Sequence, residues 1–373
     1  MDWVGEHLVY VSDPVRVKAY RSAVAVTVRE GFLVADLGCG TGVLGLLCLQ
    51  AGAARVYAID STAMVDVART TYSKLGLLEK ATFTRAHSAR AILPEQVDLV
   101  ICDQVGYFGF DAGIVQSYAD ARRRILKPGG ALVPSRIRLY AAPVESASGY
   151  QPIAAWNEDP VPTALRWIAE CAANTRHPVR LKPSELLGSP VHLGDIDLYA
   201  NEGRLLSWKA SLPIERSGTL HGIAGWFECE LAPGVWMTNS PLAERPIQRP
   251  QAFLPLSKGT DVAVGEHLAV SVVARPHDEI LAWAVDTPGG RHFSQSTWQS
   301  SPLTPEQIKR ASPDHVPKTN SYGLARLTVL GYCDGRRTAH EIEQLVLANH
   351  PGLLPSPEES SRFVAHVLEK DTD

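Results

Sequence analysis

The stretch Val34-Ala-Asp36-Leu-Gly38-Cys-Gly40-Thr-Gly42 decides the fold, because it joins a short apolar run to an apolar helical pattern. Glycines at such a junction let the backbone turn tightly and approach a ligand, and the start of the next helix offers free N–H groups. The spacing is GxGxG, whereas the loop that cradles a dinucleotide pyrophosphate reads GxGxxG. The stretch predicts a strand, a ligand-binding turn and a helix. A nicotinamide enzyme, or a turn that only packs the helix on the strand, remains an alternative.

Polar residues at the ends of two strands extend this predicted binding loop. Asp36 ends the first strand, where its charge suits a cationic ammonium better than a phosphate. Asp60 ends the next apolar run, where a carboxylate can accept hydrogen bonds from both ribose hydroxyls, and Ser61 follows it. With Gly38 and Gly40, these residues resemble the first motif and the next acidic position of class I S-adenosylmethionine (SAM)-dependent methyltransferases. The resemblance implies that SAM is the cofactor.

The first third of the chain alternates short apolar runs with helical patterns, which is typical of a parallel sheet covered by helices. We expect strands at Leu33–Leu37, Arg55–Ile59, Ala81–Thr84 and Val97–Cys102, helices at about Val43–Ala51, Met64–Leu75 and Ile114–Leu126, and a turn at Pro128-Gly129-Gly130. After about Arg136 the runs are shorter, several alternate apolar with polar residues, and Gly, Pro and Asn bound them. This texture favours antiparallel strands.

The predicted fold class is therefore α/β, with three parts in order along the chain. Residues 1–136 form an N-terminal lid and a Rossmann-like SAM-binding domain, and residues 137–300 form a second domain of antiparallel strands. Residues 320–373 form a small helical domain after a polar linker, with Thr338 placed to cap a helix over Glu341–Leu347. Thr163–Ala172 interrupts the second part with a helical pattern, which we interpret as an inserted arm.

Composition narrows the class of protein. The chain has 373 residues, 45% hydrophobic and 20% charged, which is a globular composition. A net charge of −4 argues against a nucleic-acid partner bound by phosphate neutralisation. No apolar run approaches the roughly 20 residues that span a bilayer, and no leader pattern starts the chain, so we expect no membrane partner. The six cysteines suit neither a disulfide framework nor a zinc site, so we expect reduced thiols, no metal and a cytoplasmic location.

A second resemblance starts near the N-terminus. His7, Asp13, Arg16 and Tyr20 form an H-x5-D-x2-R-x3-Y pattern that resembles the segment before the fold in protein arginine methyltransferases. The resemblance covers about residues 3–290 and implies that Arg16 pairs with the carboxylate of the cofactor. A guanidinium matches a carboxylate bidentately, which agrees with this role. Ser88 lies where class I enzymes contact the adenine amine. The resemblance also implies that residues 137–300 form a β-barrel-like domain with a dimerisation arm at about residues 150–194, and hence a homodimer.

The departures from that family concern the acceptor. Family members hold the substrate guanidinium with two glutamates after the fourth strand. The first of these positions is Asp103 here, and the second is Ala112, with Asp111 as the nearby acid. The family's later Thr-His-Trp loop reads Pro246-Ile247-Gln248. From the incomplete clamp we hypothesise that ordinary peptidyl arginine is not the acceptor.

Four residues are candidates for catalysis. Asp103 follows the strand Val97–Cys102, at the edge where ligands bind, and is the candidate electrostatic group or base. Tyr107 in the next hairpin, with neighbouring phenylalanines, and Tyr10 in the lid would wall a pocket suited to a flat aromatic acceptor. His7 could relay a proton.

These residues favour methyl transfer to a carbon or nitrogen of an indole or tryptophan-type natural product, a small aromatic substrate. The alternative is a side chain, arginine or other, of a ribosomal or other peptide. The segment around Cys333-Asp334-Gly335 and Thr338 resembles winged-helix modules that recognise precursor peptides, which implies either a peptide partner or a remnant of such a module that only packs and dimerises. A third hypothesis is a non-enzymatic subunit that regulates a sister subunit.

Overall fold

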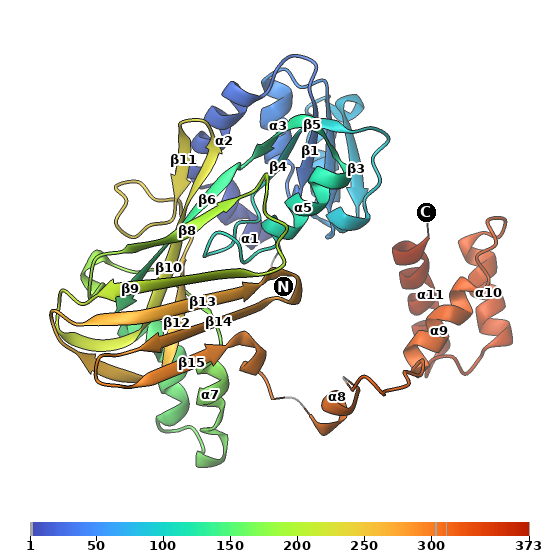
Figure 1. Cartoon of the computed structure of the whole chain (residues 1–373). Helices are drawn as coiled ribbons and strands as arrows, with labels where there is room; N and C mark the ends of the chain where they lie inside the picture. The colour runs from blue at the N-terminus through green and yellow to red at the C-terminus, as the bar shows by residue number, and fades with distance from the viewer. Residues whose placement is uncertain (1–2, 303, 311, 373) are drawn as a thin grey trace. The chain divides into compact units, whose positions relative to one another are not determined.

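The computed structural model describes residues 3–302, 304–310 and 312–372. They form two compact units, one within residues 1–302 and one within residues 303–373. The division falls earlier than residue 320, where the sequence places the start of the small domain. The larger unit combines a helix-covered sheet with a second region built from β-strands (Figure 1).

A five-stranded parallel sheet forms the first region and confirms the predicted α/β class. Its strands, in sheet order, are β3 (Ala81–Arg85), β2 (Arg55–Asp60), β1 (Leu33–Leu37), β4 (Val97–Cys102) and β5 (Leu126–Val133). Its helices are α1 (Trp3–Val11), α2 (Pro14–Thr27), α3 (Val43–Gln50), α4 (Met64–Lys74) and α5 (Ile114–Arg124). This order places the ends of β2, β1 and β4 next to one another, where ligands bind in open α/β sheets.

The predicted turn at residues 128–130 is wrong, because these residues continue a strand. Pro128, Gly129 and Gly130 lie inside β5, and the register of the β4–β5 pair shifts between Val97 and Leu99. β5 is an edge strand, where a proline that cannot donate to a ladder is tolerated. The turn-forming residues therefore produce an irregular strand.

Two antiparallel sheets form the second region. One contains β7 (His177–Val179), β12 (Gln251–Val262), β10 (Gly218–Ala232), β6 (Arg136–Val144) and β8 (Val191–Asp197), with β11 (Val235–Thr238) paired to β10. The other contains β15 (His292–Ser296), β14 (Ile280–Asp286), β13 (His267–Arg275) and β9 (Leu206–Pro213). β8 contacts β9 and β12 contacts β15, so the sheets meet along two edges in a barrel-like arrangement.

The predicted arm, about residues 150–194, contains short helices between β6 and β8. They are α6 (Ala147–Ala154) and α7 (Ile168–Ala173), and α7 lies beyond the edge of the sheets (Figure 1). The predicted helix Thr163–Ala172 is two pieces, a 3-10 turn at Thr163–Leu165 followed by α7.

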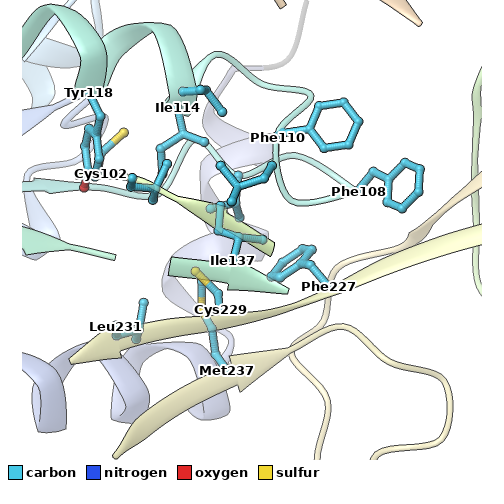
Figure 2. Packing of buried hydrophobic residues seen from close by; sticks show 14 of the residues in the cluster. Cys102, Phe108, Phe110, Ile114, Tyr118, Ile137, Phe227, Cys229, Leu231 and Met237 are labelled. Carbon is cyan, nitrogen blue, oxygen red and sulfur yellow. The ribbon is translucent and has the colours of Figure 1, made fainter. Parts of the chain in front are cut away.

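The hairpin after β4 joins the two regions through their shared hydrophobic core. Phe108 and Phe110 pack with ring centroids 5.3 Å apart, and they are buried near Ile137 of β6 and Phe227 of β10 (Figure 2). A Cβ added at Gly225 would lie 2.4 Å from the ring of Phe108, so the barrel backbone closes tightly on this ring. The prediction that Phe108 walls an acceptor pocket is therefore wrong, because this side chain belongs to the core.

The described residues of the smaller unit form four helices, α8 (Pro305–Arg310), α9 (Ser321–Leu330), α10 (Ala339–Asn349) and α11 (Pro357–Asp371). Thr338 caps α10 in a reciprocal capping box with Glu341, as predicted. Apolar residues from the last three helices form its core: Ala325, Val329, Ile342, Val346, Phe363, Val364 and Val367. Its described residues form no β-strand, so they include no wing of a winged-helix module. Throughout the described chain, no helix has the length and apolarity needed to cross a membrane.

Candidate active site

The glycine loop of residues 38–42 takes a conformation that requires glycine. Gly38, Gly40 and Gly42 have φ values of +66°, +52° and +80°, a region that side chains disfavour. A Cβ added at Gly40 would lie 2.6 Å from the His7 ring, and one added at Gly38 would lie 2.7 Å from Gln104. The missing side chains leave a cradle at the ends of β1 and β2.

This cradle is part of a cavity of about 430 Å³, which we call the cofactor cavity. The structure brings nine of the predicted site residues to its lining: His7, Tyr10, Arg16, Gly38, Gly40, Asp60, Ser61, Asp103 and Tyr107. The carboxylate of Asp60 accepts hydrogen bonds from the Gly40 N–H at 2.9 Å and the Thr62 N–H at 2.8 Å. These bonds fix its orientation beside the loop.

Two predicted cofactor ligands lie outside the lining of this cavity. Asp36 is fully buried, and its Oδ2 accepts a hydrogen bond from the Gly45 N–H at 2.9 Å, so it ties β1 to α3. Burial, the charge of Asp60 and that of Asp103 raise the pKa of Asp36 to about 7, against the effect of the Gly45 hydrogen bond and of Arg16. Ser88 lies in a 3-10 turn after β3, where its carbonyl accepts from Arg124 at 3.0 Å.

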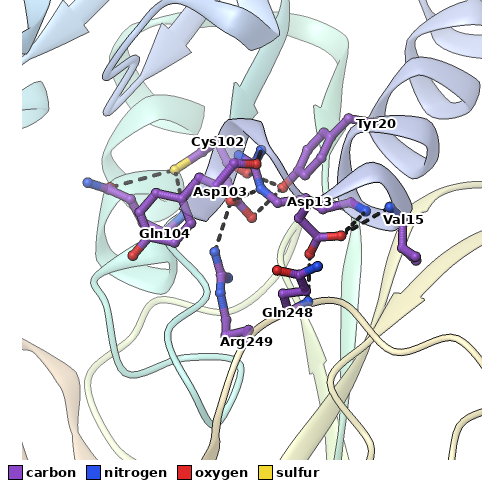
Figure 3. Close-up of polar contacts among 10 residues, drawn as sticks. Asp13, Val15, Tyr20, Cys102, Asp103, Gln104, Gln248 and Arg249 are labelled. Carbon is purple, nitrogen blue, oxygen red and sulfur yellow. Dashed lines mark hydrogen bonds and ion pairs between the residues drawn. The ribbon is translucent and has the colours of Figure 1, made fainter. Parts of the chain in front are cut away.

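Asp103 is the centre of a buried charge cluster (Figure 3). Its Oδ2 accepts from Arg16 Nε at 2.6 Å and from Arg249 Nη2 at 2.9 Å, and its Oδ1 accepts from the Tyr20 hydroxyl at 2.9 Å. Burial alone would raise the pKa of this carboxyl, but the two guanidiniums and the hydrogen bonds lower it below its usual value. Asp103 is therefore held ionised, which suits an electrostatic role and opposes the predicted role as a base.

Helix α2 and the loop before β12 are locked together beside this cluster. Asp13 caps α2, its Oδ1 accepting from the Val15 and Arg16 N–H groups at 3.0 and 3.1 Å. Its Oδ2 accepts from the Gln248 N–H at 2.6 Å (Figure 3). Gln248 directly precedes Arg249. One capping carboxylate thus fixes the segments that carry both arginines of the cluster.

A second guanidinium site lies at the other side of the cavity. Arg176, from the segment between α7 and β7, forms an ion pair with Asp111 and lies over the Tyr107 ring, 5.0 Å from its centroid. Arg249 lies in the same way over the Tyr10 ring, at 5.4 Å. Each site therefore combines one carboxylate with the face of one tyrosine, and each holds a guanidinium of the chain itself.

The lining of the cofactor cavity fits a nucleoside bearing an amino-acid tail. Asp60 ends β2, where its carboxylate can accept from ribose hydroxyls, and the glycine loop admits close approach of the ligand. Arg16 has a five-donor guanidinium, of which Nε serves Asp103 and Nη1 serves the Tyr10 carbonyl at 3.0 Å. Its other donors suit a carboxylate. When bound there, SAM supplies a methyl group activated by a positively charged sulfur.

Comparison with known proteins identifies the family. Residues 34–130 match a model described as a methyltransferase domain, and residues 135–283 match the arginine methyltransferase oligomerization subdomain. The chain is 30% identical over 290 residues to protein arginine N-methyltransferase 6 of Xenopus laevis, covering 74% of this chain and 85% of that protein. The chain belongs to the protein arginine methyltransferase family. It is thus a SAM-dependent methyltransferase, which confirms the predicted enzyme class and cofactor.

Solved structures show the same fold. The Trypanosoma brucei PRMT1 enzyme-prozyme heterotetrameric complex with AdoHcy is similar with a TM-score of 0.69 at 20% identity, over 78% of this chain and 97% of that one. Arabidopsis thaliana protein arginine methyltransferase 10 is similar with a TM-score of 0.66 at 23% identity, over the same shares. The predicted barrel-like domain after the methyltransferase domain is confirmed.

The sequence did not predict a role for Arg249 or Arg176. In the structure these arginines form ion pairs with Asp103 and Asp111 in the cavity. Arg249 directly follows the loop 246–248, which the sequence had already aligned with the acceptor site. A basic residue beside that loop was therefore a usable signal. Arg176 carried no such signal, because it lies in the inserted arm, far in sequence from Asp111.

Proposed function

We propose that this protein transfers a methyl group from SAM to an arginine side chain of a peptide or protein. The observation that carries this proposal is the pair of carboxylate–tyrosine sites that hold Arg249 and Arg176. A carboxylate binds a guanidinium through charge-assisted hydrogen bonds, and a tyrosine face attracts its charge. The chemistry that surrounds the cavity is therefore guanidinium-binding chemistry.

The chain's own groups would orient and stabilise the acceptor. The acceptor nitrogen forms the new N–CH₃ bond with its lone pair while the C–S bond breaks with its electrons on sulfur, and the nitrogen releases one proton. We assign Asp103 to charge stabilisation, since its lowered pKa makes it a weak proton acceptor. The proton then leaves to solvent, with His7 in the cavity lining as the candidate relay.

The relatives favour this proposal over the indole-type acceptor that the sequence suggested first. Their names describe arginine methyltransferases. The buried Phe108 also reduces the aromatic lining on which the indole hypothesis depended, and Tyr10 and Tyr107 instead lie against guanidiniums. Recruitment of the peptide by the helical unit within residues 303–373 remains part of the proposal.

We further propose that the arm mediates a homodimer. The second region matches the oligomerization subdomain of this family, and Leu165 and Trp167 are exposed large hydrophobic residues on the arm. Trp167→Glu should shift the mass measured by light scattering from two chains to one. An unchanged mass would exclude Trp167 from the interface.

Product analysis tests the proposed acceptor. The protein is incubated with SAM and a peptide containing one arginine, with a matched peptide in which lysine replaces it, and with free tryptophan. Mass spectrometry should show a gain of one or two methyl groups on the arginine peptide alone. Methylation of tryptophan with none on the arginine peptide would contradict the proposal.

A further inference from the structure

A second cavity of about 650 Å³, which we call the outer cavity, lies against the cofactor cavity. It lies between the segment after β4 and the β13–β14 connection, with Phe110, Pro276 and Glu279 in its lining. Its lining shares four residues with that of the cofactor cavity: Gln104, Asp111, Ala112 and Arg176. These four residues lie where the two cavities adjoin, and we call them the wall.

The wall contains one fixed partner and one that can move. Asp111 is held by the hairpin backbone, because its Oδ1 accepts from the Phe108 N–H at 2.8 Å and Gly106 leaves room for it. A Cβ at Gly106 would lie 2.1 Å from that oxygen. Arg176 comes from the segment between α7 and β7, and its guanidinium lies at the end of a long, flexible side chain. Arg176 is therefore the member of the ion pair that can be displaced.

Arg176 and Arg249 differ in how deeply their side chains are buried. The side chain of Arg249 is 8% exposed, and its partner also binds Arg16 and Tyr20, so removing Arg249 would disturb a buried cluster of charges. The side chain of Arg176 is 25% exposed, on a partner that is 9% exposed. Burial also lowers the pKa of Arg176, so its charged form is incompletely compensated. Arg176 is the more easily displaced guanidinium.

We propose that Arg176 occupies the place of the acceptor guanidinium on Asp111 and Tyr107, and that the acceptor arginine enters from the outer cavity by displacing it. This inference rests on the proposed function. It makes Arg176 an internal competitor and Asp111 the group that binds the acceptor. A site that is mostly occupied by its own chain shows an apparent affinity reduced by the open fraction, so removing the competitor tightens binding.

The test measures binding of Nα-acetyl-arginine amide to protein saturated with S-adenosylhomocysteine, by calorimetry. Arg176→Ala should bind the probe about tenfold more tightly than the unchanged protein, because the open fraction approaches one. Arg176→Lys should lie between the two, since it keeps the charge without the planar fork. Adding Asp111→Asn to Arg176→Ala should remove the gain.

Arg275→Ala is the matched control, because Arg275 is an exposed arginine beside the outer cavity that does not line it. It should bind the probe as the unchanged protein does. If the unchanged protein methylates arginine peptides while Arg176→Ala and Arg176→Lys bind the probe no more tightly than it does, the displacement is wrong and the proposed function stands. If neither arginine binding nor arginine methylation occurs in any variant, both are wrong.

Discussion

The cofactor side and the acceptor side of the cavity are built in different ways. Apart from Arg16, the cofactor side comes from one short stretch, because the glycine loop and Asp60 lie within residues 38–62 and bond directly to each other. The acceptor side is assembled from α1, α2, the hairpin after β4, the segment before β7 and the loop before β12. The first depends on backbone conformation, and the second depends on pairing of buried charges.

Substitutions on the cofactor side should therefore weaken ligand binding, whereas substitutions on the acceptor side should lower the stability of the fold. A side chain added at Gly38 or Gly40 meets strain and a clash with Gln104 or His7 at the ligand site. Removing one charge from the Asp103 cluster leaves other buried charges without compensation, which costs folding free energy. The substitutions below separate these two modes.

The largest effect is expected at Asp103. Asp103→Asn leaves Arg16 and Arg249 buried without their carboxylate, which should lower the free energy of unfolding by about 3–5 kcal/mol in urea titrations. Asp66→Asn is the control, because its ion pair with Arg69 is half exposed and should contribute less than about 1 kcal/mol. Equal losses in the two variants would show that the cluster is not a structural unit.

The next effect is on cofactor binding through the glycine loop. Gly40→Val forces a β-branched residue into positive φ and against His7, so its Kd for S-adenosylhomocysteine should rise by at least about 100-fold. Gly76→Ala has a φ of +68° with no atom within 4 Å of the added Cβ, so it provides strain without a clash. That control should lose stability and keep its cofactor affinity. Unchanged binding of S-adenosylhomocysteine by Gly40→Val would contradict the role of the glycine loop in holding the cofactor.

A smaller effect is expected at the carboxylate beside the loop. Asp60→Asn keeps the shape but loses the charge that strengthens bonds to ribose hydroxyls, so calorimetry should show about tenfold weaker binding of S-adenosylhomocysteine. An analogue that lacks the 2′-hydroxyl should lose much less affinity through this substitution. If both ligands lose affinity equally, Asp60 acts through the loop conformation alone.

The smallest effect is a pH dependence from Asp36. Burial raises its pKa to about 7, so the folded protein keeps a proton that the unfolded chain, with a pKa of about 3.9, releases. Its contribution to stability is fully present below pH of about 4 and is lost as pH rises to about 7. The Tm of the unchanged protein should therefore fall more between pH 5 and pH 8 than that of Asp36→Asn. Parallel Tm curves would show that Asp36 does not titrate there.

The same contrast explains what the sequence could predict. The glycine loop, Asp60 and the strands β1 to β4 follow from local spacing and periodicity, and the structure contains them nearly where we expected them. The arginines on the acceptor side depend on long-range packing, which places Arg176 on Asp111 and Arg249 on Asp103. Phe108 was misjudged for the same reason, since its burial depends on β10 closing over the hairpin.

The structure also changes the interpretation of Asp103 and Ala112, which stand where the family has glutamates. From sequence, the missing second glutamate suggested that arginine is not the acceptor. In the structure, Asp111, beside Ala112, binds a guanidinium over Tyr107. A carboxylate one position away, which the sequence identified only as a nearby acid, therefore pairs with a guanidinium.

The displacement of Arg176 is tested most directly by a crystal structure with S-adenosylhomocysteine and a peptide containing a single arginine. The peptide guanidinium should lie within hydrogen-bond distance of Asp111 and over the Tyr107 ring, with Arg176 moved off that carboxylate. Arg176 still paired with Asp111, while the peptide arginine lies outside both cavities, would contradict it.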